Sequence, residues 1–325
     1  MSIKEIRDEI NKGILNEIQG TVDDYKYIKI SSTHITIEDL FEETEENLDE
    51  GYVITDLFHT LQGVTIGGKG STNIFSDVEG NVDIDGDLVL KSIGGRNIIA
   101  NKIIWTDEYM IFPYTIKDEN FIPAFYDEKL EEDTLNFDIN LDASEIGFDR
   151  HRKLTYRIAK GYIKYPMIAE YICKFYEDLY YREFEKKHIL DYNKSWYEFH
   201  RSRWTKIISA PKIVCRRLMK TPSFAIDEEG YLPKDSVISL IPKETFDTFL
   251  EELNDEIDQD INILNGYHYI LSFLNSEEFS RYLANKRAKK QGGYLIVGNK
   301  MFQNFIIPFP SSLDEDEISE RMTPI

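Results

Sequence analysis

The chain has 325 residues, with 59 acidic against 38 basic side chains and a formal net charge of −21 at pH 7. Hydrophobic residues make up 42% and charged residues 30%, values that fit a globular protein and exclude wholesale disorder. An apolar run of about 18 residues is absent, and the charged start lacks a signal-peptide core, so we expect no membrane span. Two cysteines without metal-type spacing exclude a disulfide framework and predict a cytoplasmic protein.

The first 50 residues are predicted to form a segment of their own. Isoleucines recur at helical spacing through residues 3–18, which predicts an amphipathic helix that either packs on its own domain or docks onto another subunit. Residues 25–30 and 33–37 alternate like strands, and 38–50 is an acidic, solvated stretch.

A glycine-rich segment covers residues 61–75 and includes Gly63, Gly67, Gly68 and Gly70. It matches neither GxxxxGK[ST] nor GxGxxG, and the pattern predicts a following strand instead of a helix, so a mononucleotide site is not favoured. We interpret it as a flexible loop whose tip, Lys69, approaches a nucleic-acid backbone or groove. Residues 81–87 match half of a calcium loop but lack its final glutamate, which favours a hairpin.

The rest of the chain mixes strand and helix patterns. Strands are expected over 98–105, 109–116, 212–218 and 236–241, and helices over 166–187, 244–257 and 262–290. We therefore expect an α/β protein of the α+β type, with a mixed sheet and amphipathic helices. Residues 51–310 are predicted to form its main domain, and 311–325 a frayed acidic tail.

Basic residues are distributed unevenly along this acidic chain. Residues 150–220 hold 18 basic and 7 acidic side chains, a net charge of +11, so the remainder sums to −32. Residues 281–300 add six basic side chains and no acidic one. Because salt screens charges beyond about 8–10 Å, local charge governs a binding face, and a DNA-binding surface stays compatible with the acidic total. The acidity still predicts weak non-specific binding by the isolated chain.

Guanidinium and aromatic side chains concentrate in residues 196–242, on predicted strands and loops. Such groups suit a surface that holds phosphates and reads base edges, although basic residues also decorate ordinary solvated sheets. We expect the following side chains to read bases, hold phosphates, or support and clamp the DNA: Lys69, Arg201, Arg203, Trp204, Lys206, Lys212, Arg216, Arg217, Lys220, Arg287, Lys289 and Lys290.

No catalytic or metal-ligating residue is assigned. The six histidines lack ligand spacing, and there is no GxSxG. No Pro-Pro occurs, so the tetrapeptide with which adenine methyltransferases hold a flipped base is absent. Glu185 and Lys187 have a nuclease-like Glu-x-Lys spacing on a predicted charged helix, which leaves a divergent magnesium-dependent nuclease as an alternative.

Several segments together follow the order of a known domain. They are GVTIGGKGSTNIF, SIGGRNI, YMIFPYTI, KYPMIAEYICKFYEDLYYRE, SWYEF, PKIVCRRL, FAIDEEGYLPKDSVISLI, YHYILSFLNS and FIIPFP. This ordered set, over residues 60–310, resembles the C-terminal specificity region of TaqI-like adenine-N6 DNA methyltransferases and type IIG restriction–modification enzymes.

The resemblance implies a target-recognition domain that contacts the major groove of double-stranded DNA. In that family a catalytic domain normally precedes it, whereas residues 1–50 stand there in this chain. We therefore expect a non-catalytic specificity subunit for a separate methyltransferase, docked through residues 3–18, in a restriction–modification or related defence system. S-adenosylmethionine would be bound by the partner and no cofactor by this chain. A protein-binding module with an acidic, DNA-mimicking surface is a further alternative.

Overall fold

The computed structural model describes residues 27–30, 33–36, 51–68, 70–76, 88–124, 165–192, 194–257, 261–285 and 293–324. The chain divides into two units, Met1–Gly51 and Tyr52–Ile325. In the first, β1 (Tyr27–Ile30) and β2 (Thr33–Thr36) pair as an antiparallel hairpin, which confirms the two strands predicted there. The helix expected over 3–18 and the acidic stretch 38–50 lie outside the described residues.

An antiparallel four-stranded sheet organises the second unit. Its order is β15 (Phe224–Asp227), β13 (Lys212–Arg216), β17 (Val237–Pro242) and β4 (Phe58–Gln62). The two strands predicted over 212–218 and 236–241 are thus confirmed, except that the first ends at Arg216 and a short β14 (Leu218–Met219) follows.

Both faces of this sheet are covered, because alternate residues of β13 enter different cores. Ile213 and Cys215 belong to the large core that includes α8 (Thr245–Ile257) and α9 (Ile263–Leu274). Val214 points to the opposite face, where it joins Ala225 and Val237. By the same period of two, Lys212 and Arg216 lie on the Val214 face.

The helical layer differs from the prediction at two points. The prediction of one long helix over 262–290 is wrong, because α9 ends before Asn275 and a second helix, α10 (Glu277–Asn285), follows. The Asn275 side chain is hydrogen-bonded to the backbone of Phe224. The prediction of a frayed tail over 311–325 is also wrong, because residues there form α12 (Glu315–Met322), which buries Ile318 and Met322 in the large core. Shorter elements complete this region: β3 (Gly51–Val53), α3 (Ile54–Leu57), β18 (Leu295–Ile296), α11 (Asn299–Phe302) and β19 (Ile306–Pro308).

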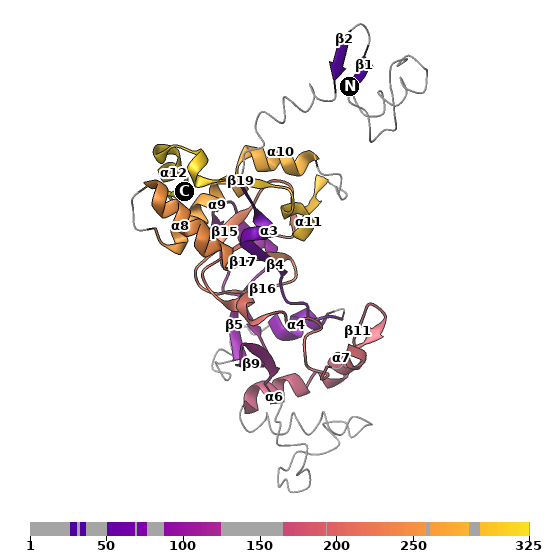
Figure 1. Cartoon of the computed structure of the whole chain (residues 1–325). Helices are drawn as coiled ribbons and strands as arrows, with labels where there is room; N and C mark the ends of the chain where they lie inside the picture. The colour runs from indigo at the N-terminus through magenta and orange to yellow at the C-terminus, as the bar shows by residue number, and fades with distance from the viewer. Residues whose placement is uncertain are drawn as a thin grey trace. The chain divides into compact units, whose positions relative to one another are not determined.

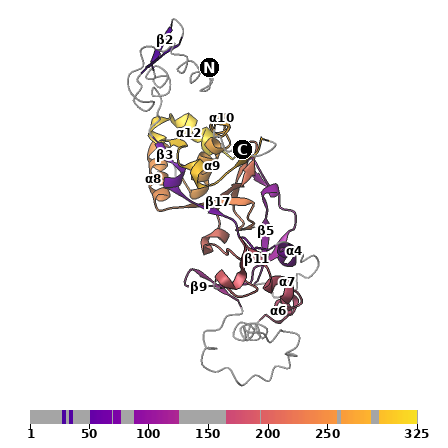
Figure 2. The same ribbon diagram turned by 90° about the vertical axis from the view of Figure 1, so that its right-hand side faces the viewer.

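A second core surrounds a smaller sheet of β16 (Leu232–Pro233), β5 (Val89–Ile93) and β8 (Tyr109–Ile111). Figures 1 and 2 show the helices around it at one end of the unit, with α8, α9 and α12 at the other. Its helices are α4 (Ser71–Ser76), α6 (Pro166–Cys173) and α7 (Tyr176–Tyr180). Here α4 corrects the expected strand after the glycine-rich loop. The helix expected over 166–187 is likewise two short helices followed by the hairpin of β11 (Glu183–Phe184) and β12 (Lys187–His188).

The unit also contains two further antiparallel hairpins. One pairs β6 (Ile98–Ile99) with β7 (Lys102–Ile103), and the other pairs β9 (Tyr114–Lys117) with β10 (Asn120–Pro123). Helices, antiparallel sheets and one parallel strand pair together confirm the α+β class. In the part of the chain that the structure describes, every helix is too short or too polar to cross a bilayer.

Candidate nucleic-acid interface

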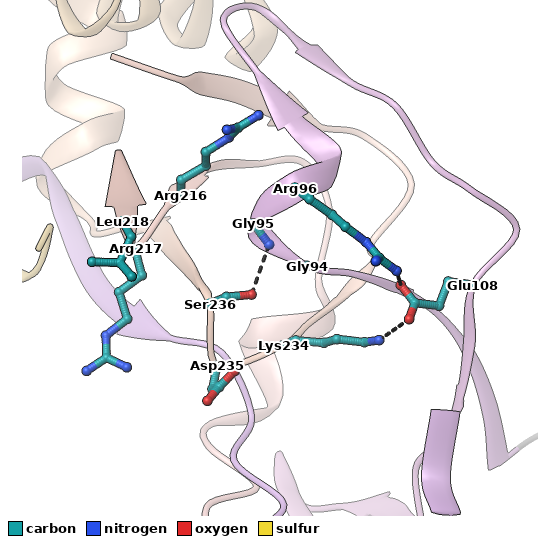
Figure 3. A pocket seen from close by; sticks show the side chains of 10 residues that line it. All are labelled: Gly94, Gly95, Arg96, Glu108, Arg216, Arg217, Leu218, Lys234, Asp235 and Ser236. Atoms are coloured by element: carbon teal, nitrogen blue, oxygen red, sulfur yellow. Dashed lines mark hydrogen bonds and ion pairs between the residues drawn. The ribbon is translucent and has the colours of Figure 1, made fainter. Parts of the chain in front are cut away.

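A cleft of about 580 Å³ opens where the turn after β5 meets the ends of β13 and β16 and the start of β17. Figure 3 shows the residues around it, which we call the arginine cleft. Those residues are Gly94, Gly95, Arg96, Glu108, Arg216, Arg217, Leu218, Lys234, Asp235 and Ser236.

Hydrogen bonds between two segments that lie far apart in the sequence, β5 and β16, hold one side of this cleft together. β16 runs parallel to β5, and beyond the pair the N–H of Lys234 donates to the Ile93 carbonyl at 2.9 Å. The N–H of Gly95 donates to the Ser236 hydroxyl at 2.9 Å. A Cβ on Gly95 would lie 2.9 Å from the Ser236 carbonyl oxygen, so glycine permits this approach.

Arg216 and Arg217 leave the end of β13 in opposite directions (Figure 3). Arg216 stays on the Val214 face, where its Nε donates to the Ile98 carbonyl at 2.5 Å. Arg217 is held through its backbone, donating to the Ser236 carbonyl at 2.8 Å and accepting from the Val297 N–H at 2.7 Å. Both arginines line the cleft, and each has a backbone that is fixed by pairing, since Arg216 pairs with Val237 of β17.

Glu108 partly neutralises the cationic wall. Its carboxylate forms an ion pair with Lys234 and lies 3.7 Å from Nη2 of Arg96, whose side chain is 79% exposed. Exposed pairs of this kind contribute at most about 1 kcal/mol, so an incoming phosphate can compete for Arg96. Sequence reasoning missed Arg96, Glu108 and Lys234 as cleft residues.

A second cleft of about 240 Å³, here called the glycine cleft, shares Lys234, Asp235 and Ser236 with the first. Its other wall includes Val64–Gly68, in which Gly67 and Gly68 adopt positive φ values of 81° and 79°. The two clefts therefore border the same turn between β16 and β17. Lys69, expected at the tip of the glycine-rich loop, lies outside the described residues.

The buried Arg182 holds the glycine-rich loop in place through hydrogen bonds to backbone carbonyls. Its guanidinium donates to the carbonyls of Ile66 at 2.8 Å and Trp196 at 3.1 Å, and also to the Glu198 carbonyl. Burial lowers the pKa of Arg182 to about 10, so the group remains charged at pH 7. The loop is thereby tied to the SWYEF segment, which sequence analysis had read only as part of an aromatic surface.

Arg201 and Arg203 line neither cleft, but both are bonded to the segment that leads into the glycine cleft. Arg201 exchanges backbone hydrogen bonds with Thr65 at 2.9 Å, and its Nη2 lies 3.6 Å from Glu185. Arg203 has φ +74° and donates from Nε to the Gly63 carbonyl at 3.1 Å. Burial lowers the pKa of Arg203, and the nearby charges of Arg201 and Arg217 lower it further. The charges of Arg201 and Arg217 therefore reach the Arg203 guanidinium, and the charge of Asp235 opposes them.

Lys212 is the one expected DNA contact that the structure corrects. Its side chain is fully buried and its Nζ lies 2.5 Å from Oδ2 of Asp227, which is buried as well. The two residues are cross-strand partners in β13 and β15, and Lys212 also donates to the Ser209 carbonyl at 2.8 Å. A side chain without exposed surface cannot reach a phosphate. Lys212 therefore holds a buried ion pair within the sheet and is not a DNA contact.

Trp204, Lys206 and Lys220 are not among the residues that line the two clefts in the described ranges. The Nζ of Lys206 lies 4.8 Å from the Trp204 ring centroid, and Lys220 lies 4.8 Å from that of Tyr294. Contacts of these three with DNA stay a prediction. Arg287, Lys289 and Lys290 fall outside the described residues.

The Glu185 segment differs from its prediction, because Glu185 lies with φ +51° in the turn between β11 and β12 instead of on a helix. Its carboxylate faces Arg201, and the Nζ of Lys187 lies 6.0 Å from the Tyr192 ring centroid. Within the described ranges, no three His, Cys, Asp or Glu side chains are grouped so as to hold a metal ion.

No protein-family model matches the sequence, and no curated protein matches it. Among solved structures, the type IIG restriction endonuclease BpuSI is similar, with a TM-score of 0.44 and 14% sequence identity. The match covers 87% of this chain and 27% of that one. The chain thus spans about a quarter of the enzyme it matches, and the likeness is one of chain trace alone.

Proposed function

We propose that this chain is a DNA target-recognition subunit that works with a separate adenine-N6 methyltransferase in a restriction–modification or related defence system. One observation carries the proposal: three separate segments place four cations in the wall of the arginine cleft, and a fourth segment holds two more next to the strand that leads into the glycine cleft. Arg96 comes from η2 (Gly95–Asn97), Arg216 and Arg217 from the end of β13, and Lys234 from the β16–β17 turn. Arg201 and Arg203, in the segment after SWYEF, are bonded to Thr65 and Gly63.

The chemistry of these groups divides their roles. Exposed cations such as Arg96 suit phosphates, which position a protein on DNA without reading its sequence. Arg217 has a fixed backbone and, in the described part of the chain, a guanidinium without a hydrogen bond or ion pair. Such a fork can donate two parallel hydrogen bonds to O6 and N7 of guanine, a contact that discriminates by about 1–3 kcal/mol.

The ordered segments of the sequence support the same class of function, and methyl transfer would then belong to the partner. In this proposal the partner supplies S-adenosylmethionine and extrudes the adenine. Residues 3–18 are the proposed docking element, and double-stranded DNA is the shared ligand. The acidic total of −21 favours specific over non-specific retention, because charges outside the clefts repel the backbone.

A selection from a random duplex library tests this proposal. The chain, alone and with a candidate adenine methyltransferase from the same genomic neighbourhood, is incubated with the library at low salt, and retained duplexes are sequenced. We expect one enriched motif that contains adenine.

The variant Arg217→Ala should lose about tenfold of its preference at one guanine, with weak binding of random duplex little changed. Arg281→Ala is the matched control, because Arg281 lies exposed on α10, paired only with Glu277 among described residues. Equal retention of all sequences by the wild-type chain, with and without the partner, would overturn the proposal.

A further inference from the structure

Asp235 occupies the point where the two clefts meet and lines both. Like Ser236, it is an exposed residue of the turn between β16 and β17, and its carbonyl accepts a hydrogen bond from Nε2 of Gln62 at 2.9 Å. On either side of it, the Lys234 N–H donates to Ile93 and the Val237 N–H donates to the Lys234 carbonyl, both at 2.9 Å. The turn that carries Asp235 is therefore hydrogen-bonded to β4, β5 and the start of β17.

The three consecutive side chains of this turn are engaged differently. Lys234 extends to Glu108 and the Ser236 hydroxyl accepts from Gly95, whereas the Asp235 carboxylate points away from both (Figure 3). No ion pair joins Asp235 to another residue of the described ranges. Its charge acts on Arg203, and Arg217 acts on the same guanidinium, so a free carboxylate lies among cations.

A carboxylate in that place is the wrong group for a phosphate and the right one for a base. It accepts hydrogen bonds and donates none, and it repels the DNA backbone. The donors that a base pair presents in the major groove are the exocyclic amino groups, N4 of cytosine and N6 of adenine. We propose that Asp235 is a specificity-determining residue that accepts a hydrogen bond from an exocyclic base amino group in the major groove.

This inference rests on the proposed function, and its test uses the same library selection with the full chain. The variant Asp235→Asn keeps an acceptor and the shape of the side chain, but adds a donor and removes the charge. We expect it to lose about tenfold of the preference where the base is cytosine. Asparagine can itself bond N6 and N7 of adenine, so Asp235→Ala, which has no side-chain acceptor, is tested beside it and should show the tenfold loss for either base. The total retention of random duplex by Asp235→Asn should rise, because a charge that repels phosphate is gone.

Two controls separate this role from a structural one. Asp255→Asn makes the same change on the exposed side of α8; it should leave base preferences unchanged and raise retention less than Asp235→Asn does. Thermal unfolding of Asp235→Asn should match that of the wild type, since the turn is held by backbone hydrogen bonds.

Base analogues identify which amino group is read. If the affected position is cytosine, a duplex with 2-pyrimidinone in its place lacks N4; if it is adenine, unsubstituted purine lacks N6. We expect the analogue to weaken wild-type binding about tenfold and Asp235→Ala binding little, as for two partners of one interaction. A wild type that selects a motif and an Asp235→Ala variant with the same base preferences would overturn this inference alone. A wild type that selects no motif would overturn the proposed function with it.

Discussion

Replacing Lys212 by methionine distinguishes a structural lysine from a DNA-contacting one. Lys212 and Asp227 are both fully buried, and their side chains lie 2.5 Å apart. Burial lowers the pKa of the Lys212 ammonium, and the Asp227 carboxylate opposes that shift. Methionine preserves most of the side-chain volume, so the substitution chiefly leaves a buried carboxylate without its cation.

The expected cost follows from what Asp227 retains. Removing one partner of a buried ion pair destabilises a protein by about 3–5 kcal/mol. Oδ1 of Asp227 still accepts from the N–H groups of Glu229 at 3.1 Å and Gly230 at 2.9 Å. We therefore expect the lower end of that range, about 3 kcal/mol. Adding Asp227→Asn removes the orphaned charge and keeps an acceptor, so the double variant should recover about 1–2 kcal/mol.

Urea unfolding followed by tryptophan fluorescence measures these free energies, and library selection at a temperature where each variant is folded measures DNA preference. Lys300→Met, an exposed lysine on α11, is the matched control and should stay within about 0.5 kcal/mol of wild type. We expect the folded Lys212→Met fraction to select the wild-type motif. A variant as stable as wild type that has lost its motif would refute the structural assignment.

Two further predictions concern the groups that support the clefts. Gly63→Ala would place a Cβ 1.9 Å from the Lys234 carbonyl oxygen, so it should lower the free energy of unfolding by about 3 kcal/mol or prevent folding. Gly298→Ala is its control: a Cβ there would meet open space, so the variant should have little effect in the same urea experiment. Similar stability of the two variants would contradict this packing argument. Both ring nitrogens of His200 are buried without a partner in the described ranges, and burial lowers the pKa of His200 below its usual value of 6.5. Because the unfolded chain then binds a proton more readily than the folded one, the free energy of unfolding should fall as the pH drops below 6.5. His200→Phe, which keeps a ring against Phe184, should reduce the dependence of the unfolding free energy on pH between 7.5 and 5.5; an unchanged dependence would show that other groups carry it.

Local pattern was sufficient for β13 and β17, the two inner strands of the central sheet, and for the helix α8. β13 and β17 are continuous runs of β-branched and apolar residues, and α8 repeats Phe246, Phe249 and Leu253 at helical spacing. The same rules failed where a side chain is bonded to a distant segment. Asn275 is bonded to Phe224, 51 residues away, and that contact coincides with the break between α9 and α10. Ser276 followed by two glutamates was a capping signal that could have located the break.

The position of Lys212 could not be predicted from its own strand. In a strand covered on both faces, apolar side chains appear at every position, and alternation no longer marks the exposed side. A lysine at the start of such a strand is ordinarily at the edge, where it would face solvent. Here its partner is Asp227 across the sheet, and the register Lys212↔Asp227 is a tertiary fact with no local signature.

The same reasoning explains why an acidic chain can carry a cationic cleft that its sequence did not reveal. Arg96 and Lys234 stand in segments without a basic run, and they meet because β16 pairs in parallel with β5. Parallel pairing joins segments far apart in sequence, so a charge count along the chain detects Arg216 and Arg217 but not the residues that complete their surroundings. Those surroundings include two carboxylates, Glu108 bound to Lys234 and Asp235 without an ion pair in the described ranges. A cleft that retained only cations would bind any phosphate backbone; one that keeps a free acceptor among them gains selectivity at the expense of affinity.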